Sequence, residues 1–399
     1  MEEDLISFEA ALEIVLKEAS PVGAERVPLP DSVGRVLAGQ VLSDMDMPPF
    51  DKSAVDGYAI HPDDSNNPGD TNPLKVTETI AAGTAPQFEL TPGHCARIMT
   101  GAMIPTGTGR VVMVEDSLTL PDGRVLIRDA GKASNICVRG EDIRKGEQVL
   151  EKGTVITPAE VAVLATVGVT RPLVAALPRV GILSTGDELV EPAEKPEGAL
   201  IRNSNASQLM AQGRSVPALT RYYGIIPDRG ELLLNAITTA LDENDVVLLT
   251  GGVSMGDFDL VPAVMAECGI RILFRKIAVQ PGKPTVFGRK GDKIIFGLPG
   301  NPVSSFVLFE MMVRPFLLRK MGSLRPLPVL CLPMGTEFTR RNRARKGMIP
   351  VRLNEGKVYP VEYHGSAHIN AYVFATGIMM METGIATVKE GERVHVRLL

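Results

Sequence analysis

Acidic side chains recur in two glycine-rich segments of the chain. Asp187 and Glu188 lie in STGDEL, and Asp257 and Asp259 lie in TGGVSMGDFD. Glycine lets backbone N–H groups approach a phosphate, but two carboxylates about 4 Å apart repel by roughly 4 kcal/mol at an effective dielectric near 20. A divalent cation would bridge the carboxylates and the phosphate oxygens. Because the ligands are hard oxygens with no nearby Cys or His, they favour Mg²⁺ over zinc.

A regular alternation of elements would position these segments. Residues 178–320 alternate between five apolar runs typical of strands (179–184, 218–223, 245–250, 271–279 and 293–298) and stretches with helical periodicity. This alternation predicts a doubly wound, mainly parallel sheet with helices on both faces, in which ligands bind at the carboxyl ends of the strands. STGDEL, TGGVSMGDFD and a third segment, GLPGNPVSS, all fall at such ends. Any one of them could be an ordinary turn with a helix N-cap, but three together favour a binding site.

The regions on either side of the α/β segment have a different texture. Residues 7–19 have helical periodicity, with Ser7 as N-cap, and TPAEVAVLATVG predicts a second helix beginning at Pro158. Between these helices and again after 326, short apolar pieces separated by Gly, Pro and Asp predict β structure. We therefore expect an α/β multidomain protein, with these domains: a discontinuous N-terminal domain (1–43 plus 147–177), an inserted β-rich domain (44–146), an α/β domain (178–325) and a C-terminal β-barrel or sandwich (326–399).

Composition excludes several classes of function. The net charge of −5 gives no indication of a nucleic-acid partner. The apolar runs fall short of the roughly 18 residues that a membrane span needs, and the acidic start, MEEDLISFEA, has no signal-peptide core. The four cysteines have no metal-ligand spacing and indicate reduced core thiols, so we expect a cytoplasmic protein. No P-loop pattern occurs, which argues against an ordinary kinase or GTPase.

Seven motifs in order resemble one known family. PPFDKSAVDGYAI, MTGAMIPTG, GEDIRKGE, STGDEL, TGGVSMGDFD, QPGKPTVFG and GLPGNPVSS together resemble the molybdopterin molybdenumtransferases of the MoeA and gephyrin E-domain type. The resemblance implies Mg²⁺-dependent insertion of molybdate into adenylylated molybdopterin with release of AMP. It also implies a homodimer whose active site is shared between subunits. A pyrophosphate-bearing substrate fits the glycine-rich loops and the cation inferred above.

The same resemblance assigns roles to individual residues. The catalytic positions it implies are Asp56, Thr100, Asp142, Glu188, Asp228 and Asp259, of which Glu188, Asp228 and Asp259 would hold the metal. The binding positions it implies are Gly251, Gly252, Ser254, Lys276, Lys283, Pro299, Pro302, Arg352 and Ser366. Read without the family, Asp56 would be a turn residue, Asp228 a helix N-cap and Lys283 a solvated loop lysine.

One departure and two rival functions remain open. Many relatives carry a basic residue before PGKP, where this chain has Gln280, which leaves the preference between molybdate and tungstate undecided. A molybdopterin adenylyltransferase would resemble 178–320 alone, so the additional domains argue against it. A non-catalytic scaffold of the gephyrin kind is disfavoured by the acids at the predicted site.

Overall fold

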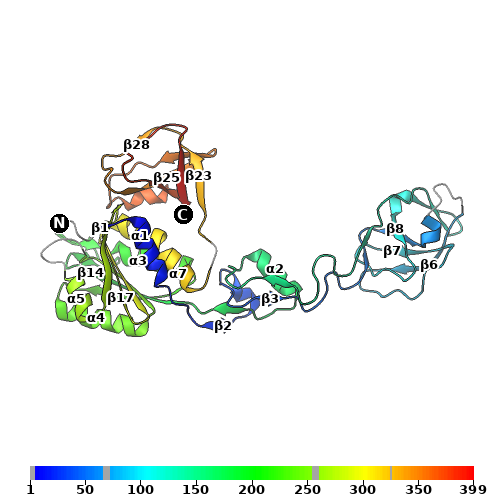
Figure 1. The fold of residues 1–399 in the computed structure, drawn as a ribbon, viewed down its shortest axis with the longest axis horizontal. Helices are drawn as coiled ribbons and strands as arrows, with labels where there is room; N and C mark the ends of the chain where they lie inside the picture. The colour runs from blue at the N-terminus through cyan, green and yellow to red at the C-terminus, as the bar shows by residue number, and fades with distance from the viewer. Residues whose placement is uncertain (1–4, 66–71, 254–259, 324–325) are drawn as a thin grey trace. The chain divides into compact units, whose positions relative to one another are not determined.

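The computed structural model describes residues 5–65, 72–253, 260–323 and 326–399 (Figure 1). The chain forms two compact units. The first comprises Met1–Gly39, Lys152–Pro158 and Arg171–Leu399, and the second comprises Gln40–Glu151 and Ala159–Thr170. The N-terminal segment thus packs with the α/β and C-terminal regions in one unit. No helix in the described ranges is long and apolar enough to cross a membrane.

A seven-stranded sheet forms the centre of the first unit. Its order is β1-β19-β21-β22-β18-β14-β17. Four neighbouring pairs are parallel, whereas β21 runs antiparallel to both β19 and β22, so the sheet is mainly parallel but mixed. The strands are β1 (Leu5–Ile6), β14 (Arg179–Thr185), β17 (Leu219–Ile226), β18 (Val246–Thr250), β19 (Arg271–Ile277), β21 (Pro284–Lys290) and β22 (Lys293–Leu298).

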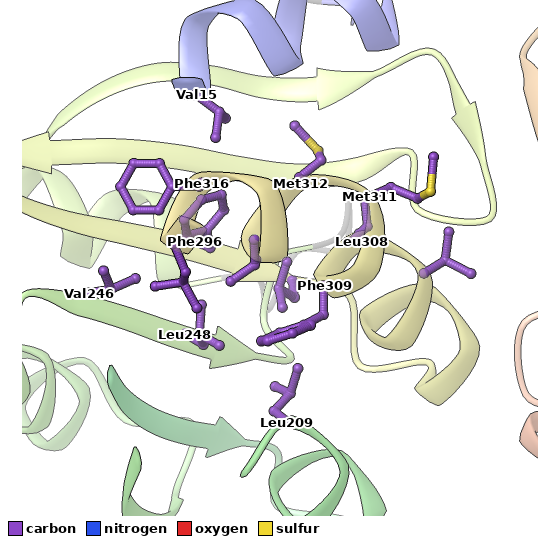
Figure 2. Close-up of a cluster of buried hydrophobic side chains, with 14 of the residues drawn as sticks. Val15, Leu209, Val246, Leu248, Phe296, Leu308, Phe309, Met311, Met312 and Phe316 are labelled. Carbon is purple, nitrogen blue, oxygen red and sulfur yellow. The ribbon is translucent and has the colours of Figure 1, made fainter. Parts of the chain in front are cut away.

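Helices cover both faces of this sheet because successive strand side chains point to opposite sides. Val246 and Leu248 of β18 pack into one core, and Val247 and Leu249 pack into the other. The first core receives α1, α3, α6 and α7, which contribute Val15, Leu209, Leu308 and Phe316 (Figure 2), and the second receives α4 and α5. The helices are α1 (Phe8–Lys17), α3 (Ser204–Ser215), α4 (Gly230–Glu243), α5 (Val261–Glu267), α6 (Pro302–Leu308) and α7 (Arg314–Lys320).

Aromatic and aliphatic side chains fill the first core. Phe287, Phe296, Phe309 and Phe316 are fully buried, and the rings of Phe287 and Phe296 lie 4.8 Å apart between centroids. Each such burial contributes about 1.5–3 kcal/mol. This layer packs α6 and α7 against the strands and so fixes the position of the connection between β22 and α6.

Local signals explain where several helices start. The Ser7 hydroxyl accepts a hydrogen bond from the Ala10 N–H at 3.1 Å, which confirms Ser7 as the N-cap of α1. α2 (Pro158–Thr166) begins at Pro158 as predicted. The expected helix over 302–320 is present but interrupted: a π turn at Phe309–Val313 separates α6 from α7. Such turns widen a helix locally and occur often at functional positions.

The C-terminal region forms a six-stranded sheet of order β20-β25-β27-β29-β23, with β26 also paired to β25. Its strands are β20 (Val279–Gln280), β23 (Val329–Pro333), β25 (Lys346–Asn354), β26 (Lys357–Pro360), β27 (Gly377–Met381) and β29 (Arg393–Leu398). β20 comes from the α/β segment and pairs in parallel with the start of β25. The C-terminal sheet therefore includes a strand from outside the C-terminal region.

The second unit is β-rich, as its sequence predicts. A four-stranded sheet of order β6-β7-β5-β8 is accompanied by three two-stranded ladders, β3–β12, β4–β11 and β9–β10. The main strands are β5 (Gly57–Ile60), β6 (Lys75–Ile80), β7 (His94–Ile98) and β8 (Arg110–Met113). The ladders are formed by β3 (Val41–Leu42), β4 (Lys52–Ser53), β9 (Ser117–Thr119), β10 (Val125–Ile127), β11 (Ile136–Cys137) and β12 (Gln148–Leu150).

Candidate active site

A pocket of about 400 Å³ lies where three strands of the central sheet end. The loops that follow β14, β18 and β22 all line it, as expected for the carboxyl ends of parallel strands. The predicted segments STGDEL, TGGVSMGDFD and GLPGNPVSS all contribute lining residues, among them Glu188, Gly251, Gly252, Pro299 and Gly300, and Asp228 joins them from the loop after β17. The structure therefore brings together three loops that the sequence places far apart.

Asp228 is hydrogen-bonded to two residues at the end of β14. Asp228 accepts a short hydrogen bond from the Thr185 hydroxyl, and its own N–H donates to Asp187 Oδ1 at 3.2 Å. The carboxylate of Glu188 folds over Gly186, since a Cβ added there would lie 2.4 Å from Glu188 Oε2. Two carboxylates, Glu188 and Asp228, thus line the pocket and supply oxygen ligands of the kind that Mg²⁺ accepts.

Asp228 does not cap a helix. α4 begins at Gly230 with Arg229 in the N-cap position, so the N-cap reading of Asp228 is wrong. The reason is that its carboxylate is already engaged with Thr185 across the end of the sheet. Asp228 instead lines the strand-end pocket.

Gly251 is required by the close approach of two loops. Its φ is +94°, and a Cβ added there would lie 2.2 Å from the Thr185 carbonyl oxygen. Its N–H donates to the Leu298 carbonyl at 3.1 Å. Gly251 therefore ties the loops after β14, β18 and β22 together through backbone contacts, which leave little room for a side chain.

Sequence reasoning missed two residues that line the pocket. Thr185 lies inside STGDEL but was not singled out, and Asn205 directly precedes ASQLMAQ, the stretch that was interpreted as a helix. The detectable signal was the cluster of Asn203, Ser204 and Asn205 ahead of apolar periodicity. Asn203 is indeed the N-cap of α3, accepting from the Ala206 N–H at 3.3 Å, and Asn205 is left to face the pocket.

One predicted lysine, Lys276, lies near the end of β19, and another, Lys283, directly precedes β21. Lys276 pairs with Pro284 across the two strands, and Pro284 lines the pocket. The Lys283 carbonyl accepts from the Ile277 N–H at 3.0 Å, which closes the turn. This turn places the PGKP segment at the edge of the pocket.

The predicted residues beyond β22 fall in two places. Pro302 is the first residue of α6, and the next N–H, that of Val303, donates to the Ser366 carbonyl at 3.1 Å. Ser366 therefore lies against the start of α6. Arg352 is an exposed residue of β25, with its guanidinium 6.0 Å from the centre of the Tyr359 ring.

The second unit contains three further predicted residues. Asp56 Oδ1 accepts hydrogen bonds from the N–H and the hydroxyl of Thr100, at 2.6 and 2.8 Å. These bonds hold the pKa of the Asp56 carboxyl below its usual value, chiefly through the Thr100 backbone N–H and then its hydroxyl. Asp56 is thus more than a turn residue. Asp142 lies in another turn, where its N–H donates to the Met47 carbonyl at 3.0 Å.

Ser254, Asp257 and Asp259 lie outside the described residues. Within the described part of the chain, no group of three or more His, Cys, Asp or Glu side chains is arranged to hold a metal ion. Glu188 and Asp228 alone still match magnesium chemistry, because Mg²⁺ is commonly bound through one or two carboxylates together with substrate phosphates. The donor set therefore fits a metal whose coordination a phosphate-bearing substrate completes.

Family models match almost the whole chain. Residues 6–168 match the MoeA N-terminal region (domains I and II), 181–319 the probable molybdopterin binding domain, and 333–399 the MoeA C-terminal region (domain IV). Molybdopterin molybdenumtransferase of Bacillus subtilis is 35% identical over 94% of this chain and 90% of its own. The Staphylococcus epidermidis protein of the same name is 33% identical over 98% and 95%.

A solved structure agrees with this. The molybdopterin biosynthesis MoeA protein from Pyrococcus horikoshii OT3 has a TM-score of 0.86 and 29% identity, and the match covers 99% of this chain and 100% of that one. The shared fold has an α/β central domain with β-rich N-terminal and C-terminal regions. The full-length relatives and the three matching domain models lead to one conclusion: the chain belongs to the MoeA family of molybdopterin molybdenumtransferases.

Proposed function

We propose that this enzyme of molybdenum cofactor biosynthesis inserts molybdate into adenylylated molybdopterin, in the presence of Mg²⁺, and releases AMP. The observation that carries the proposal is the strand-end pocket, in which two carboxylates face three glycine-containing loops. Carboxylates and exposed backbone together suit a metal-bound phosphate better than an uncharged ligand.

Backbone and acidic groups have separate roles in this proposal. Gly251, Gly252 and Gly300 line the pocket, and the absence of side chains there lets the pyrophosphate of the substrate approach the main chain. Glu188 and Asp228, with Asp259, would hold Mg²⁺. When bound, the ion would neutralise charge on the pyrophosphate and polarise the phosphoanhydride bond that is cleaved.

Basic and neutral donors would bind the second substrate. Molybdate is an anion, so the residues that hold it should be cations and hydrogen-bond donors. Pro284 lines the pocket, Lys276 of β19 pairs with it and Lys283 directly precedes it, and Ser366 lies against the start of α6. We assign these three residues, together with Arg352, to molybdate and to the pyrophosphate beside it.

The Asp56 carboxylate is suited to accept a hydrogen bond from a bound substrate or to pair with a positively charged group. Its two hydrogen bonds from Thr100 favour the charged carboxylate. Thr100 would therefore favour the ionised form of Asp56.

The direct test is a reaction with purified protein. Adenylylated molybdopterin, molybdate and Mg²⁺ are supplied, and AMP is measured by chromatography. We expect AMP release that requires both molybdate and the metal. The proposal would be refuted if no AMP is released when all three components are supplied. It would also be refuted if the protein instead consumes ATP with molybdopterin, a result that would indicate an adenylyltransferase.

We also propose that the enzyme is a homodimer and that each active site combines Asp56 of one subunit with Asp259 of the other. The test mixes inactive Asp56→Ala with inactive Asp259→Ala under conditions that exchange subunits. Each mixed dimer then has one site with both changes and one with neither. Because random pairing makes about half of the dimers mixed, activity should return to about one quarter of wild type. No recovery after verified exchange would show that the two residues serve the same chain's site.

A further inference from the structure

One side chain, which itself lines the strand-end pocket, is hydrogen-bonded to the turn between β22 and α6. Asn205 Nδ2 donates a hydrogen bond to the Gly300 carbonyl at 2.7 Å. Asn205 is 7% exposed, and Gly300 is the middle residue of the Pro299–Asn301 turn, all of which lines the strand-end pocket. The turn has no other side-chain hydrogen bond among those described. Asn205 is therefore placed to set how far this turn projects into the pocket.

Asn205 is itself held by the interface between α3 and α6. Its Oδ1 lies 3.3 Å from the Ser305 hydroxyl, and Ser305 is fully buried. The Gln208 side-chain amide lies 3.5 Å from the same hydroxyl and donates to Gln212 Oε1 at 3.3 Å. Asn205, Gln208 and Gln212 are three and four residues apart, so they share one face of α3.

The row of polar groups continues to the π turn. Gln212 Nε2 donates to Glu310 Oε1 at 2.8 Å, and Glu310, which is 4% exposed, forms a two-pronged ion pair with Arg314 at 2.6 and 3.1 Å. We call Asn205, Gln208, Gln212, Ser305, Glu310 and Arg314 the polar seam. Apolar side chains could fill such a helix interface in many registers, whereas buried hydrogen-bonded groups match in only one.

We propose that Asn205 is a positioning residue for the substrate pocket, and that the polar seam keeps α3 and α6 in the register that lets Asn205 hold the Gly300 carbonyl. The expectation that the Pro299–Asn301 turn contacts the substrate rests on the proposed function. Loss of the hydrogen bond should loosen the turn and weaken binding of the adenylylated pterin. The acids that would hold the metal lie on other loops, so the chemical step should be largely retained.

The test compares Asn205→Ala with a matched control, Asn244→Ala. Asn244 is also buried, at 3% exposure, and its side-chain amide donates to the Ala240 carbonyl at 2.8 Å. It lies before β18, at the opposite end of that strand from the pocket. Each variant loses two side-chain hydrogen bonds, one to a backbone carbonyl and one to a hydroxyl group (Ser305 for Asn205, Tyr223 for Asn244), so the two should lose similar stability. Only Asn205→Ala should alter the pocket.

Two readouts separate positioning from stability. Hydrogen–deuterium exchange of the ligand-free protein should be about tenfold faster for the amides of Gly300, Asn301, Val303 and Ser304 in Asn205→Ala but unchanged in Asn244→Ala, since one hydrogen bond of about 1.4 kcal/mol corresponds to a factor of ten. In the AMP-release assay, Asn205→Ala should raise the KM for adenylylated molybdopterin about tenfold, with kcat within about threefold of wild type.

The outcomes are distinguishable. An unchanged KM in folded Asn205→Ala, or an equal rise of KM in Asn244→Ala, overturns the proposal. Because Asn205 also lines the pocket, a raised KM with unchanged exchange of the turn amides overturns it too, since Asn205 would then act on the substrate directly. If wild-type protein releases no AMP, the proposed function has failed, and the exchange experiment alone then decides whether Asn205 holds the turn. If Asn205→Ala does not fold, Asn205→Ser is judged by the same criteria, because a serine hydroxyl is too short to reach the Gly300 carbonyl.

Discussion

Replacing Gly251 with alanine should lower the free energy of unfolding for two separate reasons. The first is backbone strain, because Gly251 has a φ of +94° and a non-glycine residue there costs about 1–2 kcal/mol. The second is a collision, because the added Cβ would lie 2.2 Å from the Thr185 carbonyl oxygen. An ordinary contact is about 1 Å longer, and forcing such a contact apart costs about 1–3 kcal/mol.

Gly224 provides the matched control. Its φ is +91°, and an added Cβ would meet nothing within 4 Å, so Gly224→Ala has the strain without the collision. We expect Gly251→Ala to lower the free energy of unfolding by about 1–3 kcal/mol more than Gly224→Ala. The activity of Gly251→Ala should also be much lower than that of Gly224→Ala, since displacing a site by about 1 Å can reduce a rate about a hundredfold.

The measurements are urea unfolding of both variants, followed by fluorescence or circular dichroism, and AMP release. The m-values of the two variants should agree, so that the difference in midpoint reports stability. Equal losses of stability in Gly251→Ala and Gly224→Ala would refute the inference that the loops after β14 and β18 are in backbone contact. Full activity of folded Gly251→Ala would refute the placement of these loops at the active site.

Three further predictions concern the proposed site. Thr100→Val removes one of the two hydrogen bonds that lower the pKa of Asp56, so the carboxyl pKa should rise toward its usual value. On acidification, any activity that needs ionised Asp56 should then be lost at a higher pH than in the wild type. An unchanged pKa of Asp56 in an NMR titration would contradict this. Gln280→Lys should tighten molybdate binding in calorimetry, and more so at low salt, whereas unchanged affinity at low salt would show that residue 280 does not face the anion. Asp259→Asn should abolish metal-dependent AMP release in a folded protein, and normal release would remove Asp259 from the metal site.

The central sheet could be predicted from sequence because its strands are long and apolar. Val246–Thr250 and Arg179–Thr185 are buried along nearly all of their length, which gives a strong signal. β1 was not predictable in the same way: Leu5–Ile6 has only two residues, and it is a strand because it lies beside Lys276–Ile277. Pairing with a distant segment leaves no local pattern.

The site was predictable where residue type alone is informative, and not where geometry decides. Glycines and acids at strand ends indicated a phosphate and metal site, and Glu188, one of those acids, does line a pocket with Gly251 and Gly252. Asp228 also lines it, but its residue type alone indicated a helix N-cap, and only the family resemblance assigned it to the site. The contribution of Asn205 depends on a hydrogen bond to Gly300, 95 residues away. An asparagine near a helix start is ordinarily read as a cap, so only the folded structure distinguishes Asn203, which caps α3, from Asn205.

The strand β20 limits where the protein can be divided. Val279–Gln280 pairs with Lys346–Gly347 at the start of β25, and β26 pairs with the other end of that strand. A fragment beginning at residue 326 would carry all the other strands of the C-terminal sheet but leave the first part of β25 with unpaired N–H and C=O groups. Uncovered edges of this kind recruit strands from other molecules. Expression of the C-terminal region alone should therefore give a self-associating product, and a soluble fragment would need to include residues 279–280 or a substitute strand.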